Sequence, residues 1–526
     1  MTLFSFLHID DSADDETATT ALTAIITAAV HDPNPAIPLS EIYHQVAQNN
    51  GAAYLDALHV LPGLLQSSDP TARDIISILG ECGPAKEVAI AAQEALERLR
   101  PRLDGDDEDP PVQTLLELIG LYTNVIPRIK LRKKSALDTV KPYIGEIQEV
   151  IQLASHLLST EQSRELLLST SLFVERVYGW IESRDTSTSD AKVALKKLLF
   201  CSLSASAPRL DAALAQRTFE ELYPRLVVRA PQAPVEKADE SIAAAWSALR
   251  LLGQAQSDVA KDPSQPSIVL LAHLNLAELV QIDLSSIRPV FIASIQSNLI
   301  IDHTLALLLK ILHQRKGELS PEILIPLTTV LPTLASGHPD AQTRHQVFRI
   351  LGLLLSRSPP PLRLQILQDL TSNSEFPQMR VAAVGLVKEA VLEALSSEHP
   401  RNNIFASSAF LRTFGPILFQ PRPADVFDSS LSVKEFDETQ EPKRLVECLS
   451  LYYILLVRDE QNLTGIRDKD VTRSIEHNLL NPLRKQLDAW SAQPGVSEGH
   501  IHDLMPVVSL QMSLDRVDSA KKQLFE

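Results

Sequence analysis

Three kinds of residue are scarce in this 526-residue sequence: glycine, aromatic residues and cysteine. Its 17 glycines amount to about half the usual frequency of roughly 7%. Because β-hairpins and dinucleotide-binding loops both depend on glycine, this scarcity argues against sheet-based folds. Aromatic residues make up only 5% of the chain, too few for the stacking platforms that bind single-stranded nucleic acid.

The three cysteines, Cys82, Cys201 and Cys448, are odd in number and far apart. This spacing makes neither a disulfide framework nor a local CxxC metal site, and it favours a reducing compartment. Each cysteine lies in an apolar helical pattern, typical of a buried structural thiol rather than a redox sensor.

The sequence has no signal-peptide pattern, and no apolar run reaches the roughly 18 residues of a membrane helix. We therefore expect a cytoplasmic protein, with access to the nucleus, that binds no membrane.

Positively charged residues are also fewer than negatively charged ones. The chain has 49 Lys and Arg against 66 Asp and Glu, which gives a net charge of −17. Binding the phosphates of nucleic acid requires net basic surface, so nucleic acid is not expected as a direct partner. The one dense basic run, RIKLRKK at 128–134, could contact nucleic acid, an acidic lipid or an acidic partner. A solvated helix face is the favoured interpretation.

Common catalytic motifs are absent, among them GxGxxG, GxxxxGKS/T, HExxH and GxSxG. His500 and His502 form the closest histidine pair, on an expected C-terminal loop, but they lack a third metal donor. The acidic loop 104–109 has Leu115 where a Ca²⁺-binding loop needs glutamate. We therefore expect no cofactor, no metal and no enzymatic activity, with an enzyme whose site is dispersed along the chain as an alternative.

What the sequence does contain is helical pattern: 44% apolar residues and 34 prolines, which suggest many short helices. In residues 63–99, Gly83-Pro84 separates two apolar helical patterns. Similar units recur at 334–356 and 367–393. The pattern predicts an all-α fold, a HEAT/armadillo-like α-solenoid of antiparallel helix pairs.

Two further details support this interpretation. Arg344 and Arg380 occupy corresponding places in the last two units, about one HEAT period of roughly 40 residues apart. Pro326 and Pro332 interrupt a helical pattern between the units, so we expect a curved or broken helix there.

Polar, proline-containing breaks divide the chain into segments, with a boundary between halves over 230–240 and the longest irregular region at 420–441. We expect an acidic, poorly ordered N-terminus (1–20), N-terminal HEAT-like repeats (21–230), a second block of repeats (240–420) and a C-terminal helical segment (440–526).

The most distinctive stretch is 444–468, RLVECLSLYYILLVRDEQNLTGIRD, which joins an apolar helix opened by Pro442 to a polar turn. Gly465 in the turn can adopt a positive φ. A second helix should begin near Asp470 and kink at Pro482. The apolar stripe of the first helix consists of Leu445, Leu449, Tyr452 and Leu456, widened by Val446, Tyr453 and Leu455.

This turn has two interpretations. In the first, a helix–turn–helix closes the end of the solenoid, and Arg458, Asp459, Arg467 and Asp468 pair with one another to hold it. In the second, the turn and the face around Arg484 form a docking surface for a partner. The residues alone favour the first interpretation, and both can hold. The candidate partner-binding residues are Arg458, Asp459, Asn462, Arg467, Asp468 and Arg484.

The run LSLYYILLVRDEQNLTGIRD (449–468), followed by LLNPLR (479–484), resembles the signature of the glomulin / ALF4 / Yap-binding protein family. The shared pattern is an apolar helix with a double tyrosine, an RD…N.TGIRD turn and LL.PLR. The resemblance implies a HEAT-like solenoid without enzymatic activity. It extends to the fungal Yap-binding and kinetochore-associated members.

The resemblance implies different roles in different branches. Glomulin-type members bind the RING subunit of cullin ubiquitin ligases through their C-terminal part and block recruitment of the conjugating enzyme. Fungal members bind a Yap-type bZIP factor and assist its peroxide-driven oxidation. We therefore expect a monomeric adaptor with one of these protein partners. A kinetochore scaffold, or a general HEAT-type transport or assembly factor such as a karyopherin-like carrier, is the alternative.

Overall fold

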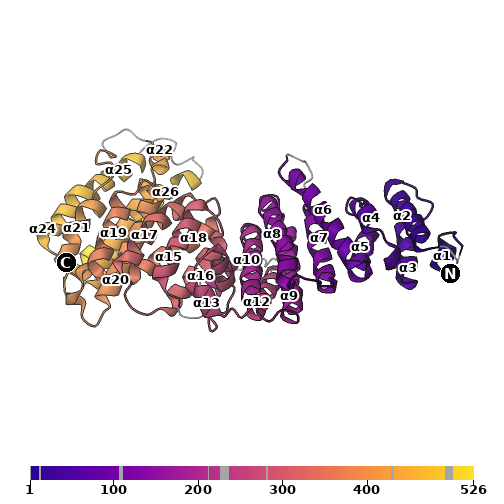
Figure 1. Ribbon diagram of the computed structural model, residues 1–526. Coiled ribbons are helices and arrows are strands. Elements are labelled where there is room, and N and C mark those ends of the chain that lie inside the picture. The colour runs from indigo at the N-terminus through magenta and orange to yellow at the C-terminus, as the bar shows by residue number, and fades with distance from the viewer. Residues whose placement is uncertain are drawn as a thin grey trace. The chain divides into compact units, whose positions relative to one another are not determined.

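The computed structural model describes residues 2–10, 14–105, 111–210, 213–224, 236–279, 282–427, 432–491 and 501–525. Within these ranges the regular structure is entirely helical, with no strand (Figure 1). The predicted all-α class is confirmed. The chain forms two compact units, unit 1 (Met1–Val290 with Asn298–Leu307) and unit 2 (Phe291–Ser297 with Leu308–Glu526).

The division between the units falls within helices α15 (Leu284–Ser297) and α16 (Ile301–Gln314). The boundary expected over 230–240 lies inside unit 1, and much of it falls outside the described residues.

Unit 1 holds the helices that precede α15. They are α1 (Leu3–Phe6), α2 (Asp15–His31), α3 (Leu39–Gln48), η1 (Gly51–Tyr54), α4 (Ala57–Leu64), α5 (Thr71–Cys82), α6 (Ala85–Leu103), α7 (Val112–Val125), η2 (Ile126–Arg128), α8 (Ala136–Ala154), α9 (Thr160–Glu182), α10 (Ser189–Ser206), η3 (Ala207–Arg209), α11 (Leu214–Leu222), α12 (Glu236–Leu251), α13 (Gln256–Lys261) and α14 (Gln265–Ala272).

Most helices of unit 1 pack in two rows. In one row α4 packs on α6, α6 on α8 and α8 on α10; in the other α3 packs on α5, α5 on α7 and α7 on α9 (Figure 1). Each helix therefore contacts the next but one along the chain, which is how an α-solenoid extends. The expected helix pair of 63–99 is present as α5 and α6, separated by Gly83 and Pro84.

Two local expectations in unit 1 differ from the structure. α2 begins at Asp15, within the segment 1–20 expected to be irregular, because the Asp14 carboxylate caps it by accepting the N–H of Thr17 at 3.0 Å. The basic run 128–134 was expected on a helix face, but residues 129–135 are not helical. Arg128 instead donates hydrogen bonds to the carbonyl oxygens of Gly80 and Gly83.

Unit 2 holds the helices that follow α16. They are α17 (Pro321–Gly337), α18 (Ala341–Ser356), α19 (Pro360–Ser372), α20 (Pro377–Leu395), η5 (Pro400–Asn402), η6 (Ile404–Ala406), α21 (Ser408–Leu418), α22 (Val433–Glu438), α23 (Glu441–Arg458), α24 (Lys469–Ile475), η7 (Glu476–Leu480, π-helical), α25 (Asn481–Ser491) and α26 (Ile501–Phe525).

Helix α23 is the centre of unit 2, because it packs against α20 on one side and α26 on the other. Its predicted stripe is confirmed: Leu445, Leu449, Tyr452 and Leu456 are all fully buried. The widening of the stripe is only partly correct, since Leu455 is buried and Val446 half-buried while Tyr453 is 37% exposed. The double tyrosine therefore places one ring in the core and the other on the surface.

The structure shows that prolines inside the predicted helices have different effects on helix continuity. α17 runs from Pro321 to Gly337 without a break although Pro326 and Pro332 lie inside it. The second helix of the C-terminal segment is interrupted before Pro482, where the π-helical turn η7 separates α24 from α25. This is consistent with the loss of a backbone donor at Pro482.

The histidine pair expected on a C-terminal loop is only partly described. His502 lies in α26 rather than on a loop, and His500 lies outside the described residues.

Candidate protein-docking groove

The polar turn after α23 is organised by the carboxylate of Asp459. This carboxylate accepts hydrogen bonds from the backbone N–H groups of Leu463 and Thr464, both at 2.8 Å, and from the Thr464 hydroxyl at 2.6 Å. Asp459 is only 1% exposed. Its side chain is therefore occupied inside the turn and does not face a partner.

Asn462 and Gly465 give the turn its backbone shape, because both have positive φ angles of 51° and 81°. The Asn462 amide donates to Asp468 at 2.7 Å, and its oxygen accepts the backbone N–H of Arg467 at 2.8 Å. A Cβ atom on Gly465 would lie 3.0 Å from the Asp468 carboxylate. Glycine is thus needed here both for its φ angle and for space.

Arg467 reaches back to the end of α23. Its guanidinium donates to the carbonyl oxygen of Leu456 from Nε at 3.1 Å and from Nη2 at 2.6 Å, and to that of Glu460 at 3.3 Å. In the described chain, no ion pair links Arg458 or Arg467 to an aspartate of the turn. The turn is held internally, as the first interpretation states, but by bonds from side chains to backbone rather than by Arg–Asp pairs.

Arg484 is also engaged within unit 2. It forms ion pairs with Glu476 of η7 and Asp518 of α26, and Lys521 of α26 pairs with the same glutamate. Burial tends to raise the pKa of Glu476, but the hydrogen bonds from Lys521 and Arg484 outweigh it and hold this pKa below its usual value. These contacts fasten α26 to η7 and α25.

A groove of about 460 Å³ lies beside the turn. One wall is α21 with the residues that follow it, and the other is the turn with α24 and the start of η7. The lining mixes apolar side chains with polar and charged ones. The apolar lining consists of Leu411, Pro416, Phe419, Val471 and Ile475.

Three charged side chains line the groove. Arg412 lies on the α21 wall, and Asp468 and Asp470 lie on the opposite wall. Arg412 is exposed and forms no hydrogen bond or ion pair with any described residue. The groove therefore combines two carboxylates and a cation that pairs with no described residue with an apolar lining.

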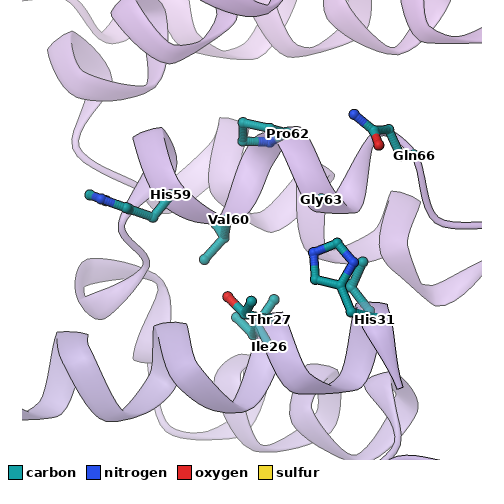
Figure 2. A pocket seen from close by; sticks show the side chains of 9 residues that line it. Ile26, Thr27, His31, His59, Val60, Pro62, Gly63 and Gln66 are labelled. Carbon is teal, nitrogen blue, oxygen red and sulfur yellow. The ribbon is translucent and has the colours of Figure 1, made fainter. Parts of the chain in front are cut away.

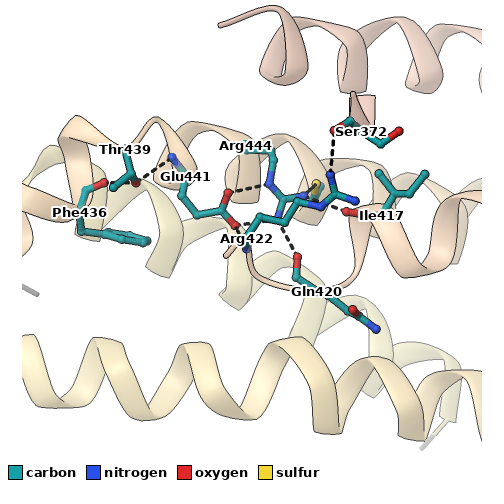
Figure 3. A network of polar contacts seen from close by, with 9 residues as sticks. Ser372, Ile417, Gln420, Arg422, Phe436, Thr439, Glu441 and Arg444 are labelled. Atoms are coloured by element: carbon teal, nitrogen blue, oxygen red, sulfur yellow. Dashed lines mark hydrogen bonds and ion pairs between the residues drawn. The ribbon is translucent and has the colours of Figure 1, made fainter. Parts of the chain in front are cut away.

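A buried ion pair holds the α21 wall in place (Figure 3). The Arg444 guanidinium binds the Glu441 carboxylate twice, at 2.7 and 2.6 Å, and both residues are about 5% exposed or less. The same guanidinium donates to the carbonyl oxygens of Ile417 at 3.1 Å and Gln420 at 2.6 Å. Because these carbonyls lie in the last turn of α21 and just after it, the pair joins the groove wall to α23.

Cys448 lies next to this pair, with its sulfur 3.5 Å from Arg444 Nη1. Burial raises the pKa of the Cys448 thiol to about 11, although the Arg444 charge opposes the shift. The thiol is thus kept protonated and shielded, as expected of a structural cysteine. Cys82, by contrast, is exposed, and Cys201 is half-buried.

Two smaller cavities are also present. The one shown in Figure 2, between α2 and α4, measures about 190 Å³ and is lined by two histidines, His31 and His59, among apolar residues. Another, between α4 and α6, measures about 100 Å³.

Within the described ranges, no three His, Cys, Asp or Glu side chains are grouped to hold a metal ion. No described helix is both long and apolar enough to cross a membrane.

Of the six predicted partner-binding residues, the structure places one, Asp468, in the groove wall. Arg458 is exposed and has no hydrogen bond or ion pair with the described residues. The other four are occupied by bonds within unit 2. Sequence reasoning missed the opposite wall, Leu411 to Phe419, whose phenylalanine-rich sequence was a signal that could have drawn attention to it.

The geometry defines the protein as a helical-repeat scaffold of the α-solenoid class with a groove in its second unit. Within that class, residues 182–513 match the model of the family described as "Uncharacterised protein family, YAP/Alf4/glomulin". Because the match covers more than half of the chain, the protein belongs to this family, as the signature at 449–484 predicted. The matched residues include the turn and both walls of the groove.

Comparison with other proteins adds little to this. No curated protein sequence matches the chain. Two crystal structures of importin beta align with it at 12% and 11% identity, covering 99% of this chain and 72% and 83% of theirs. Both have a TM-score of 0.20, so the likeness supports no argument.

Proposed function

We propose that the protein is a non-enzymatic adaptor that binds a partner protein in the groove between α21 and the turn. The observation that supports this is the contrast between two neighbouring surfaces. Most polar groups of the turn are used internally, whereas the groove beside it presents apolar side chains and an Arg412 that pairs with no described residue. Buried apolar anchors and arginines carry most of the free energy of binding at protein interfaces.

The partner we propose first is the RING subunit of a cullin ubiquitin ligase, met in the cytoplasm. Family membership supports this choice, together with the location of the groove in the C-terminal unit. A scaffold bound to the RING surface would block recruitment of the conjugating enzyme by steric exclusion, without any chemistry of its own.

A Yap-type bZIP factor is the second candidate. The net charge of −17 favours it, because an acidic surface attracts the basic region of such a factor and speeds their encounter. In this case we propose that the protein presents the factor for oxidation by peroxide without using the Cys448 thiol, which is buried and protonated.

Charge reversal of two exposed arginines tests the groove. Arg412 lines the groove and Arg458 lies on the turn outside it, so Arg412→Glu and Arg458→Glu change the net charge equally. We expect Arg412→Glu to weaken binding of a purified RING subunit or bZIP factor by tenfold or more, about 1.4 kcal/mol. Arg458→Glu should leave the affinity within about twofold, below 0.5 kcal/mol.

A second pair of variants tests the apolar lining of the groove. Val471→Arg places a charge in the groove, while Val193→Arg alters a valine that is 67% exposed on α10. Only Val471→Arg should abolish binding. Thermal unfolding of both variants serves as the control that each of them is still folded. If Arg458→Glu is the damaging change and both groove variants bind normally, the partner uses the outer face of the turn and the proposed site is wrong.

A further inference from the structure

The basic loop, residues 129–135 between η2 and α8, concentrates positive charge on an acidic protein. Only 49 of the 526 residues of the chain are Lys or Arg, but four of the five residues at 130–134 are. These four side chains are all exposed, and none of them forms a hydrogen bond or ion pair with a residue that the structure describes: Lys130, Arg132, Lys133 and Lys134.

Both ends of the basic loop are anchored to other helices of unit 1. Just before it, the Arg128 guanidinium donates to the carbonyl oxygen of Gly80 at 2.7 Å and to that of Gly83. Just after it, the Asp185 carboxylate accepts the backbone N–H groups of the first two residues of α8, at 2.9 and 3.0 Å. These four bonds join residues that are 45 to 49 positions apart in the chain. The basic loop is therefore held in place by the fold.

The carboxylates at the end of the basic loop do not neutralise it. Asp185 bonds to backbone N–H groups, and Asp138 accepts the hydroxyl hydrogen of Ser135 at 2.8 Å. Neither carboxylate forms an ion pair with a cation of the loop, within the part of the chain that the structure describes. Four positive charges are thus left for a ligand that brings its own negative charge.

Three classes of ligand carry such charge: nucleic acid, an anionic membrane and an acidic segment of a protein. Peripheral membrane binding combines basic side chains with apolar ones that insert, but the apolar residues of the loop, Ile129 and Leu131, are half-buried. Nucleic acid presents a long row of phosphates, which would also meet the acidic surface of a protein whose net charge is −17. An acidic protein segment can be as short as the loop itself, so it meets the cations alone.

We propose that the basic loop is a binding site for an acidic segment of a partner protein, a short run of Asp and Glu side chains. A single exposed ion pair contributes little to affinity, so the site depends on several pairs formed together. The anchored backbone favours this, because less conformational entropy is lost when the segment binds. The site lies in unit 1 and the groove lies in unit 2, so neither depends on what the other binds.

Binding is tested by fluorescence anisotropy of the full-length protein at an ionic strength of about 0.15 M. The probe is a labelled peptide of alternating glutamate and serine, and its neutral counterpart has glutamine in place of glutamate. Only the acidic peptide should bind. Lys133→Gln combined with Lys134→Gln should weaken its binding by about fivefold. The matched control is Arg315→Gln combined with Lys316→Gln, an adjacent exposed pair after α16, which should change the affinity by less than about 1.5-fold.

The variant Asp185→Ala separates an anchored site from general electrostatic attraction. It removes a negative charge at the end of the loop, so attraction alone would strengthen binding of the acidic peptide. Loss of the anchor leaves the loop with more conformations, and binding should instead weaken by about threefold. Thermal unfolding is the control that the variant is still folded.

Duplex DNA and vesicles of phosphatidylcholine and phosphatidylserine in equal parts test the other two classes. Both should bind the full-length protein more weakly than the acidic peptide does. The proposal is wrong if either binds more tightly than the peptide, or if the acidic peptide does not bind. Equal losses of affinity in the two double variants, or tighter binding by Asp185→Ala, would also overturn it, because general attraction would then account for the binding.

Discussion

The guanidinium of Arg467 closes α23 by donating two hydrogen bonds, at 3.1 and 2.6 Å, to the carbonyl oxygen of Leu456. The last carbonyl groups of a helix have no partner within the helix, and basic side chains near the C-terminus can satisfy them. The turn after α23 is therefore folded back onto the helix that precedes it. Its arginine and aspartates therefore stabilise the turn itself, whether or not a partner is bound.

Replacing Arg467 should therefore destabilise unit 2. We expect Arg467→Met to lower the free energy of unfolding by about 1.5–3 kcal/mol, the usual cost of losing hydrogen bonds from a charged group. Arg458→Met, nine positions earlier on the exposed end of α23, should change it by less than about 0.5 kcal/mol. Urea denaturation of the two full-length variants makes the comparison. Equal losses in both would contradict the capping role.

The buried pair of Glu441 and Arg444 should show strong coupling. Glu441→Ala leaves an uncompensated guanidinium inside unit 2 and should cost about 3–5 kcal/mol. Arg444→Leu leaves a buried carboxylate and should cost a similar amount. The double variant removes both charges, so its loss should be clearly smaller than the sum of the single losses. A double-mutant cycle by denaturation measures this, and additive losses would show that the charges do not depend on each other.

The helices could be predicted from the sequence because each depends on residues that are close together in the chain. The buried stripe of α23 follows from the 3.6-residue spacing of its apolar residues. The glycine at position 465 follows from the positive φ angle that its turn requires. Pro442 marks the start of α23 for an equally local reason. The π-helical turn before Pro482 was expected as a kink, since the lost backbone donor is visible in the sequence but the way in which the helix adjusts to it is not.

The groove and the polar contacts depend on pairings that periodicity does not reveal. Leu411 and Val471 lie 60 positions apart, and nothing in their spacing indicates that α21 faces α24. Arg467 and Asp459 are of the right types to form an ion pair. Each bonds to backbone instead because of the path of the turn, which includes a positive φ at Asn462.

Thiol chemistry should distinguish the three cysteines. With a pKa of about 11, Cys448 is about one thousandth ionised at pH 8, and it is buried as well. We expect a thiol-alkylating reagent, or peroxide, to modify exposed Cys82 first and to leave Cys448 unmodified while the protein is folded. Mass spectrometry of peptides with and without denaturant gives the order. Modification of Cys448 in the native protein would show that unit 2 opens readily.

A buried histidine pair in unit 1 provides the basis for a pH dependence. His303 of α16 is 1% exposed, and both its ring nitrogens lack a partner among the described residues. Its ring centroid lies 5.3 Å from that of His273, which contacts Asp239 at 2.9 Å. Arg217 binds the same aspartate, and Asp302 caps α11 nearby. Burial, reinforced by His273, lowers the pKa of His303 from 6.5 to about 3.

This shift makes unit 1 sensitive to acid. Below pH 6.5 the unfolded chain binds a proton at His303 that the folded protein does not, so stability is complete above that pH and is lost progressively down to about pH 3. Between pH 6 and 4 the loss should approach about 1.4 kcal/mol per pH unit. His303→Leu removes this titration, while Asp239 and Asp302 remain in both proteins and largely cancel in the difference. Denaturation at pH 7, 6, 5 and 4 should therefore show a shallower decline in the variant, whatever packing change shifts its overall stability. Parallel declines in the two proteins would mean that His303 is already protonated, or solvated, in the folded state.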